Sequence, residues 1–352
     1  MLNIYIPSDL NHNVNKKSLF ILVRPFYSDD GWKLDQQSKR WKINEGSINL
    51  VVDEAQADIM ILPYSINYYF NHGLSSYLDK YNTLCYSNNI MAYGGISGDT
   101  CRAFPEYEKI IYFRLGGFRS QLSNKNIGLP AALTDQHRTL FGSKEIIIRG
   151  KNEKPNIGFC GQANSSQIKR SKDSLMYIFE NFRRFIKKPS RIDYETIFPS
   201  AYHRYLVLKY LENSNQIHTN FIYRKKYRAG AISEHELYKT TLEYYNNIRE
   251  SDYILCVRGG GNYSIRLYET LLMGRIPIFI NTDCILPLIN EINWRDHVVW
   301  VEWSERFQID EIVSKFHNSL SDKSFKELQL RNRQLWLEKL QPGYILSNHL
   351  KK

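Results

Sequence analysis

Residues 251–283 read SDYILCVRGGGNYSIRLYETLLMGRIPIFINTD, and this stretch decides the fold of the chain. The short apolar run Tyr253–Val257 predicts a buried parallel strand. Three glycines follow at 259–261, and without Cβ atoms they allow a tight turn and the close approach of a ligand. The next residues predict a helix that ends at Gly274, a residue suited to a left-handed C-terminal position. A second apolar run ends at Asp283, so the stretch predicts a βαβ unit.

The predicted helix starts directly after the glycines, and its free N–H groups favour an anion in the loop. Arg258 precedes the glycines and Arg266 lies in the first turns of the helix, and guanidinium groups bind phosphates through paired N–H bonds. Glu269 supplies two acceptors for ribose hydroxyls. We therefore expect a nucleotide diphosphate to contact these three side chains and the loop residues Gly260, Gly261, Asn262, Tyr263 and Ser264.

Two structural alternatives compete with this site. Arg266 and Glu269 are spaced i, i+3, which also suits an ion pair on a solvated helix face. The glycines could also serve only as a tight turn between strand and helix.

A functional alternative is the dinucleotide-binding fingerprint. The sequence GGGNYS nearly fits G-x-G-x-x-G, and Asp283 follows it by about twenty residues. However, Ser264 replaces the third glycine, and a long chain precedes the motif, whereas such fingerprints usually lie early in their domain. An NAD(P)-dependent oxidoreductase therefore remains an alternative function.

The longer pattern C-x-R-G-G-G-N-x-S-x-R-x-x-E-T-L-x-x-G-x-I-P-x-x-I resembles the C-terminal signature of exostosin-like glycosyltransferases. With its continuation through Asp283, Leu286, Pro287, Ile292, Asn293 and Trp294, it covers residues 251–302. Weaker similarity extends to residues 57–64 and 154–161. The resemblance implies an α/β chain with a GT-B fold, in which two Rossmann-like domains face a cleft and a C-terminal helix crosses back to the first domain.

The same resemblance implies the reaction. Exostosin-like enzymes transfer a sugar with inversion from a nucleotide donor, here expected to be a UDP-sugar, without a metal-binding D-x-D motif. We therefore expect no metal and no cofactor besides the donor substrate, and a hexosyl-, pentosyl- or uronosyltransferase activity. The acceptor is expected to be a growing cell-surface polysaccharide or a glycolipid. We expect this chain to depart from animal exostosins by having no membrane anchor and no second catalytic domain, which puts a heparan-type substrate in doubt.

Composition and length agree with two globular α/β domains. The 352 residues are 43% hydrophobic and 14% aromatic, which excludes a disordered chain. Predicted strands, including one at 19–25, alternate with helices, as in parallel sheets. We expect an acceptor-side domain at 1–150, a nucleotide-sugar domain at 151–325, and a helical tail at 326–352 that packs back on the first domain.

The formal net charge of +11 fits nucleic acid, anionic lipid or an anionic substrate. The densest basic groups are 169–172, 183–191 and 224–228. No nucleic-acid module is visible, so a nucleic-acid-binding protein is only an alternative.

Ligands in open α/β sheets bind beyond the carboxyl ends of the strands. Because a strand is predicted at 217–223, we expect Arg224 and Arg228 to join the diphosphate site. Partners expected are a nucleotide sugar, a glycan or lipid-linked glycan acceptor, and an anionic membrane surface.

The five cysteines are odd in number and never spaced C-x-x-C, which predicts free thiols in a reducing compartment. The N-terminal residues show neither a signal peptide nor a transmembrane helix. We therefore expect a cytoplasmic location, with peripheral contact at the inner face of the membrane.

Inversion needs a general base on the acceptor side, which we expect in the first domain. Asp30 in RPFYSDDGW lies beside Trp32, which could stack on a sugar, and Asp99 in GGISGDTCR lies in a glycine-flanked loop after a strand. The alternative for both aspartates is a turn-forming role.

Overall fold

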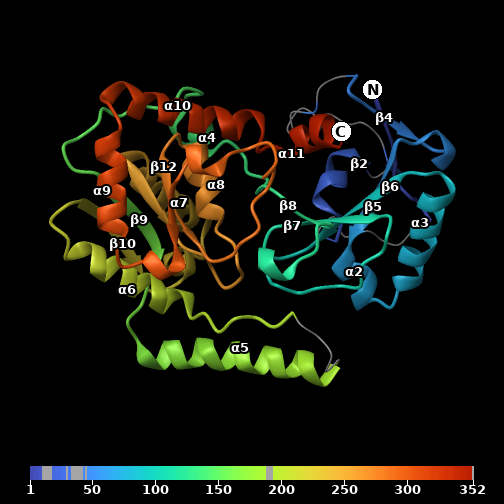
Figure 1. Cartoon of the computed structure of the whole chain (residues 1–352), viewed down its shortest axis with the longest axis horizontal. Helices are drawn as coiled ribbons and strands as arrows, with labels where there is room; N and C mark the ends of the chain where they lie inside the picture. The colour runs from blue at the N-terminus through green and yellow to red at the C-terminus, as the bar shows by residue number, and fades with distance from the viewer. Residues whose placement is uncertain (10–17, 29–30, 33–42, 44–45, 188–192, 351–352) are drawn as a thin grey trace. The chain divides into compact units, whose positions relative to one another are not determined.

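The computed structural model describes residues 1–9, 18–28, 31–32, 43, 46–187 and 193–350. The chain divides into two compact units, which are described separately below (Figure 1). Unit 1 consists of Met1–Ala132, Ile285–Leu288 and Glu338–Lys352. Unit 2 consists of Leu133–Cys284 and Ile289–Leu337.

Unit 1 is built on a six-stranded parallel sheet with the order β4-β1-β5-β6-β7-β8. Its apolar strand β5 is buried along its whole length, as a central parallel strand requires. The strands are β1 (Leu2–Tyr5), β4 (Ile48–Val51), β5 (Ile59–Ser65), β6 (Met91–Ile96), β7 (Ile110–Arg114) and β8 (Asn126–Gly128). Around them lie a small antiparallel hairpin, β2 (Tyr27–Ser28) with β3 (Gly31–Trp32), and the short helices η2 (Glu54–Gln56), α2 (Ile66–Asn71), α3 (Ser75–Ser87), η3 (Arg119–Gln121), α11 (Pro342–Tyr344) and η7 (Ile345–His349).

The strand predicted at 19–25 was wrong. Residues Ile21–Phe26 form a 3-10 helix, η1, that buries Leu22, Val23 and Phe26. An apolar run of this kind suits a buried strand or a buried helix equally well. However, Pro25 has no N–H to donate to a hydrogen bond between strands.

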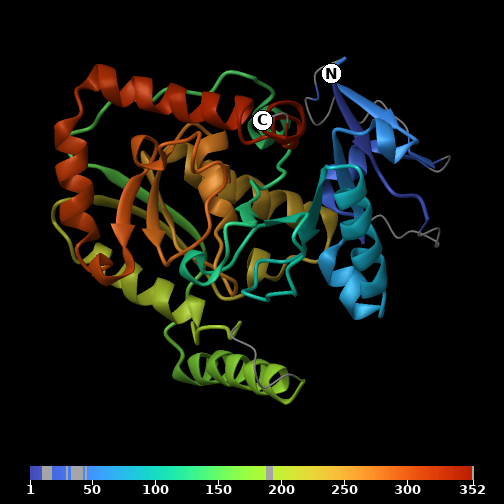
Figure 2. The same ribbon diagram turned by 45° about the vertical axis from the view of Figure 1, so that its right-hand side comes forward.

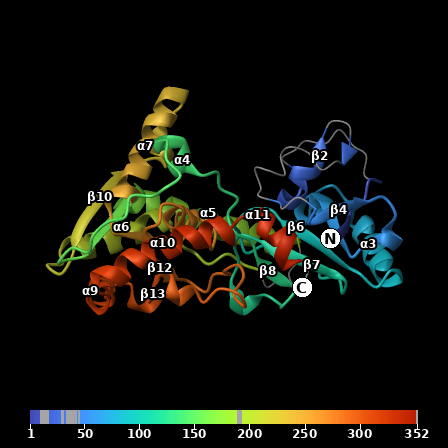
Figure 3. The same cartoon turned by 90° about the horizontal axis from the view of Figure 1, so that it is seen from above.

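Unit 2 is built on a five-stranded parallel sheet with the order β10-β9-β11-β12-β13, so the predicted βαβ unit supplies two of its inner strands. Its elements are drawn in Figures 1 and 2, and α7 extends beyond the sheet in the view of Figure 3. The strands are β9 (Asn156–Gln162), β10 (His218–Arg224), β11 (Tyr253–Cys256), β12 (Ile276–Asn281) and β13 (Val299–Glu302). The helices are α4 (Gln136–Phe141), α5 (Gln167–Lys187), α6 (Ser200–Glu212), η4 (Tyr227–Gly230), α7 (Glu234–Glu250), α8 (Ile265–Leu272), η5 (Trp294–Asp296), η6 (Trp303–Glu305), α9 (Ile309–Ser319) and α10 (Asp322–Glu338).

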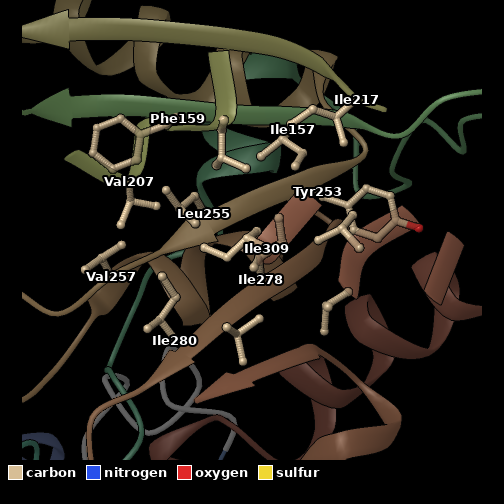
Figure 4. Packing of buried hydrophobic residues seen from close by; sticks show 14 of the residues in the cluster. Ile157, Phe159, Val207, Ile217, Tyr253, Leu255, Val257, Ile278, Ile280 and Ile309 are labelled. Carbon is tan, nitrogen blue, oxygen red and sulfur yellow. The ribbon is translucent and has the colours of Figure 1, made fainter. Parts of the chain in front are cut away.

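The core of unit 2 lies between its sheet and the helices α6 and α9. Side chains from β9, β11 and β12, including Ile157, Leu255 and Ile278, are fully buried there against Val207 and Ile309 (Figure 4). Two local signals explain how the flanking helices begin and end. Ser233 and Glu236 form a capping box at the start of α7, and Gly274 has a φ of 62° just after α8.

The border between the units differs from the one expected after residue 150. Residues 133–150 belong to unit 2 because they are bonded to α10: Arg333 pairs with Asp135 at 2.6 Å, and Gln329 exchanges hydrogen bonds with the backbone of Arg149. For the same reason α10 remains with unit 2 through Leu337, so the segment grouped with unit 1 begins at Glu338 rather than at 326.

Unit 1 also includes a short segment from the region after β12. Pro287 forms a parallel bridge with Gly128 at the end of β8. A Cβ on Gly128 would lie 2.6 Å from the carbonyl carbon of Leu286, so only glycine allows this approach. Leu286 and Pro287, which belong to the sequence pattern that continues the glycine motif, are therefore explained by packing in unit 1.

Candidate functional site

The glycine loop lies at the C-terminal end of β11, the central strand of the unit 2 sheet. The backbone N–H of Gly259 donates to the carbonyl of Tyr263, and the N–H of Tyr263 donates to Gly261, both at 2.9 Å. Asn262 is buried and exchanges hydrogen bonds with Thr282 after β12, at 2.6 and 2.9 Å. The side chain of Asn262 therefore anchors the loop to the neighbouring strand.

The glycines leave open space beside the loop. A Cβ on Gly259 or Gly260 would meet no atom closer than 3.7 Å, and neither residue has the left-handed φ that would require glycine. The space beside these two glycines would allow a ligand to approach the backbone closely.

Helix α8 begins at Ile265, with Ser264 in the N-cap position. The Ser264 side chain makes no capping hydrogen bond, so it leaves the N–H groups of the first turn to other acceptors. Tyr263, just before the cap, stacks on Tyr268 with ring centroids 5.7 Å apart. The loop thus ends at a helix N-terminus suited to an anion.

Arg258 lies beneath the loop. Its side chain is buried over the Phe198 ring, and its Nε and Nη2 donate to the carbonyls of Gly261 and Gly260, both at 3.3 Å. Arg204 on α6 donates to the carbonyls of Val257 and Arg258, at 3.3 and 2.9 Å. The sequence analysis missed Arg204. The glycine loop lies far from Arg204 along the chain, and the residues around Arg204 give no signal that α6 contacts this loop.

The charge of Arg204 is poorly compensated. Burial, and then the charge of Arg266, lower the pKa of Arg204 to about 9. A bound anion would offset both causes. His203, the neighbour of Arg204 on α6, packs against Phe198 and Trp303, and burial and three surrounding arginines lower its pKa to about 4. This part of the site thus favours negative charge.

Arg266 and Glu269 do not form the exposed pair that was the structural alternative. Arg266 is buried, donates through Nη2 to the Cys160 carbonyl at 2.9 Å, and lies 4.2 Å over the Phe159 ring. Burial opposes its charge, but Tyr244, Cys256 and Glu269 outweigh burial and raise the pKa of Arg266. Its Nε has no hydrogen-bond partner among the described residues.

Glu269 is partly buried and accepts hydrogen bonds from the hydroxyls of Tyr244 and Tyr245 on α7. Burial raises the pKa of Glu269, although these hydrogen bonds and the charges of Arg266 and Arg228 oppose the rise. Both acceptors of Glu269 therefore bond tyrosines, which the sequence analysis did not identify.

The two arginines of the basic turn after β10 have different surroundings. Arg224 is buried and donates to the Thr240 carbonyl and to Glu243, at 2.7 and 2.6 Å, so α7 holds it. Arg228 is exposed, and its charge acts on both Glu269 and Tyr245. The structure thus brings Arg228 to the region of Arg266 and Glu269, whereas Arg224 has a structural ion pair.

The two candidate bases belong to unit 1. Asp99 is half-buried in the loop after β6, and its carboxylate has no hydrogen bond or ion pair with any residue that the structure describes. The loop is held by Arg114, whose Nη2 donates to the carbonyls of Thr100 and Arg102 at 3.0 and 3.1 Å. Asp30 lies outside the described residues.

Other reactive groups can be placed briefly. Among the described residues, no three His, Cys, Asp or Glu side chains are grouped so as to hold a metal ion. Cys85, Cys101, Cys160, Cys256 and Cys284 all carry thiols rather than disulfides. Burial raises the pKa of Cys160 to about 11 and that of Cys256 to about 12. These two thiols are therefore unsuited to act as nucleophiles at neutral pH.

The glycine loop and the residues around it lie in a region that matches a known domain family. Residues 161–316 match the Exostosin GT47 domain. The chain is similar to a protein named probable glucuronosyltransferase GUT1 from Oryza sativa subsp. japonica, with 26% identity over 103 residues, which are 28% of this chain and 25% of the relative. It is also similar to probable beta-1,4-xylosyltransferase IRX10L from Arabidopsis thaliana, with 32% identity over 71 residues, 20% of this chain and 17% of the relative. The chain thus spans a quarter or less of the length of these relatives.

Among solved structures, one titled "Crystal Structure of TarM" aligns with 83% of this chain and 54% of its own, at 10% identity and a TM-score of 0.37. Each of the two units described above contains a parallel α/β sheet of the Rossmann-like kind, which confirms the two-domain α/β class expected from the sequence.

Proposed function

We propose that this chain, which is an exostosin-like glycosyltransferase, transfers a sugar with inversion from a UDP-sugar to a hydroxyl group of a polysaccharide or glycolipid. One observation carries the proposal for the donor. Arg204 and Arg258 bond backbone carbonyls in or beside an open glycine loop, which leads into the uncapped N-terminus of α8, and Arg266 lies in the first turn of that helix.

The proposed reaction is a single displacement. The acceptor oxygen forms a bond to the anomeric carbon as the bond from that carbon to the diphosphate oxygen breaks, and the nucleotide diphosphate leaves. Its new negative charge is stabilised by the arginines and by the N–H groups of α8, which together contribute several kcal/mol in comparable sites. The proton of the acceptor hydroxyl passes to a carboxylate, for which Asp99 and Asp30 are the candidates.

The finer identity of the substrates is also proposed. The relatives are named as glucuronosyl- and xylosyltransferases, which supports a UDP-linked uronic acid or pentose as donor and a polysaccharide as acceptor. Arg228 and Glu269 would face the nucleotide, with Glu269 exchanging its tyrosine partners for ribose hydroxyls. We propose no metal and no further cofactor. We also propose the cytoplasmic location expected from the sequence, which is supported by cysteines that are present as thiols rather than disulfides.

Thermal unfolding with a panel of nucleotides tests the donor. A ligand that binds only the folded chain raises its stability by mass action, so a UDP-sugar at about a hundred times its Kd should raise the unfolding temperature by roughly 5 °C. The panel includes UDP-glucuronic acid, UDP-xylose, GDP-mannose and NAD. Stabilisation by NAD and by none of the nucleotide sugars would support the oxidoreductase alternative instead.

Gly260→Ala tests whether the open loop receives the diphosphate. The added methyl group meets no protein atom closer than 3.7 Å, so the free energy of unfolding should change by less than about 1 kcal/mol. Affinity for UDP should nevertheless fall about tenfold or more, because the methyl group would occupy ligand space. Gly274→Ala is the opposite control: its Cβ would lie 2.0 Å from Ile146 Cδ1, so it should destabilise the fold. Unchanged UDP affinity in Gly260→Ala would place the diphosphate elsewhere.

A further inference from the structure

Helix α5 carries an exposed apolar face that no described part of the chain covers. Its large apolar side chains range from 48% exposed at Phe185 to 72% exposed at Ile168. With 3.6 residues per turn, most of them lie within an arc of about 120°. The members of this apolar face are Ile168, Leu175, Ile178, Phe179, Phe182, Phe185 and Ile186, with Met176 at its margin.

The orientation of α5 is fixed through its other side. Arg184 is buried and donates to the Asp193 carbonyl at 2.7 Å and to Glu195 at 3.2 Å. Asn181 exchanges hydrogen bonds with the backbone of Glu195, both at 2.8 Å. Polar contacts therefore hold the helix while its apolar face points outward, the reverse of an ordinary surface helix. In Figures 1 and 2, α5 lies apart from the sheet of unit 2.

The charge of α5 indicates what this face contacts. The helix contains six basic and two acidic residues. Both acids are already paired, Asp173 with Lys169 at 3.2 Å and Glu180 with Arg183 at 2.9 Å. Exposed Lys172 and Arg183 lie together along one border of the apolar arc on the helical wheel. An apolar face rich in Phe, Ile and Leu beside basic residues is typical of helices that lie in the interface of anionic membranes.

We propose that α5 lies flat on an anionic phospholipid bilayer. Its apolar face would enter the boundary between headgroups and acyl chains, while Lys172 would meet lipid phosphates. This contact is peripheral, since no described helix is long and apolar enough to cross a membrane.

The position of α5 would also bring the donor loop to the membrane. The Tyr177 hydroxyl of α5 donates to the Gly260 carbonyl at 2.7 Å, so the glycine loop is attached to the helix that we place on lipid. This consequence rests on the proposed function. It favours a lipid-linked acceptor, because the sugar donor would then be held beside the surface that contains such acceptors.

Vesicle flotation with the whole chain tests the proposal. Wild type should float with phosphatidylcholine vesicles that contain phosphatidylglycerol, bind much less to phosphatidylcholine alone, and lose binding as salt is raised. Each of Phe179→Ser and Phe182→Ser should weaken binding on the order of tenfold, because an apolar side chain is removed from the interface. Leu330→Ser on α10, another exposed apolar residue, should leave binding unchanged. Equal binding by wild type and the Phe179→Ser/Phe182→Ser double variant would overturn the proposal.

The rival occupant is a second copy of the chain. Sedimentation without lipid decides this: a wild-type dimer that the double variant converts to a monomer, together with no binding to vesicles, would overturn membrane docking. Thermal unfolding with the UDP-sugar distinguishes the membrane proposal from the donor proposal. The double variant should still be stabilised by the UDP-sugar, because its substitutions lie on the apolar face of α5. If wild type floats but no nucleotide stabilises it, the membrane proposal stands and the proposed donor fails.

Discussion

Arg266→Lys is expected to lower kcat at saturating donor by on the order of a hundredfold or more, while the chain stays folded. The Arg266 guanidinium lies over Phe159 and donates to the Cys160 carbonyl, and its buried Nε has no hydrogen-bond partner among the described residues. Lysine keeps the charge, but it has one nitrogen and cannot bond that carbonyl and a diphosphate with the same geometry. Release of UDP measures kcat, and urea unfolding measures stability.

Arg266→Ala is a poorer test than Arg266→Lys. The Arg266 side chain is buried. Removing it leaves the Cys160 carbonyl without this donor and opens a cavity beside Phe159, so unfolding should cost about 2–4 kcal/mol less. Arg295→Lys, a change at an exposed arginine, is the matched control and should keep wild-type kcat and stability. A wild-type kcat in Arg266→Lys would remove Arg266 from the leaving-group site.

Asp99→Asn is expected to lower kcat by about 10²–10⁴-fold, the usual contribution of a general base, with donor affinity unchanged. The Asp99 carboxylate has no hydrogen bond or ion pair with the described residues, so the amide should not disturb the fold. Arg114 holds the loop through backbone carbonyls, which the substitution does not alter. UDP release in the presence of acceptor measures kcat, and the thermal shift with donor measures binding.

The control for Asp99 is Asp79→Asn, which changes an exposed carboxylate on α3 of the same unit and should keep wild-type turnover. If Asp99→Asn also turns over at the wild-type rate, Asp99 is not the base. The same measurement on Asp30→Asn then decides between the two candidates, and wild-type rates in both variants would exclude both.

Much of the donor half was predictable because its signals are local. The run Tyr253–Val257, the glycines, the helix after Ser264 and the left-handed Gly274 follow from side-chain periodicity and backbone sterics. The structure confirms these elements and the capping box of α7. Local pattern failed at η1, where an apolar run suits a strand or a buried helix equally well and only Pro25 argued against the strand.

The predicted site residues have different surroundings. Arg258 bonds carbonyls of the glycine loop, but Arg224 has an ion pair with Glu243, and Asn262 is bonded to Thr282. The spacing of Arg266 and Glu269 suits a surface pair just as well, so spacing could not reveal their burial. Which side of a helix faces the sheet depends on what packs there, and here Phe159 and the tyrosines of α7 enclose both side chains.

The sequence by itself determined the two-domain α/β architecture and the βαβ unit, because each follows from the chemistry of neighbouring residues. Only the tertiary structure decided which distant groups lie around the glycine loop. Arg204 on α6, Tyr177 on α5 and Tyr244 on α7 reach the loop region or Glu269 from other helices. Their positions depend on packing between segments far apart in the chain, where local sequence carries no signal. The outward direction of the apolar face of α5 also depends on tertiary packing. Buried Arg184 fixes which side of the helix contacts the rest of unit 2.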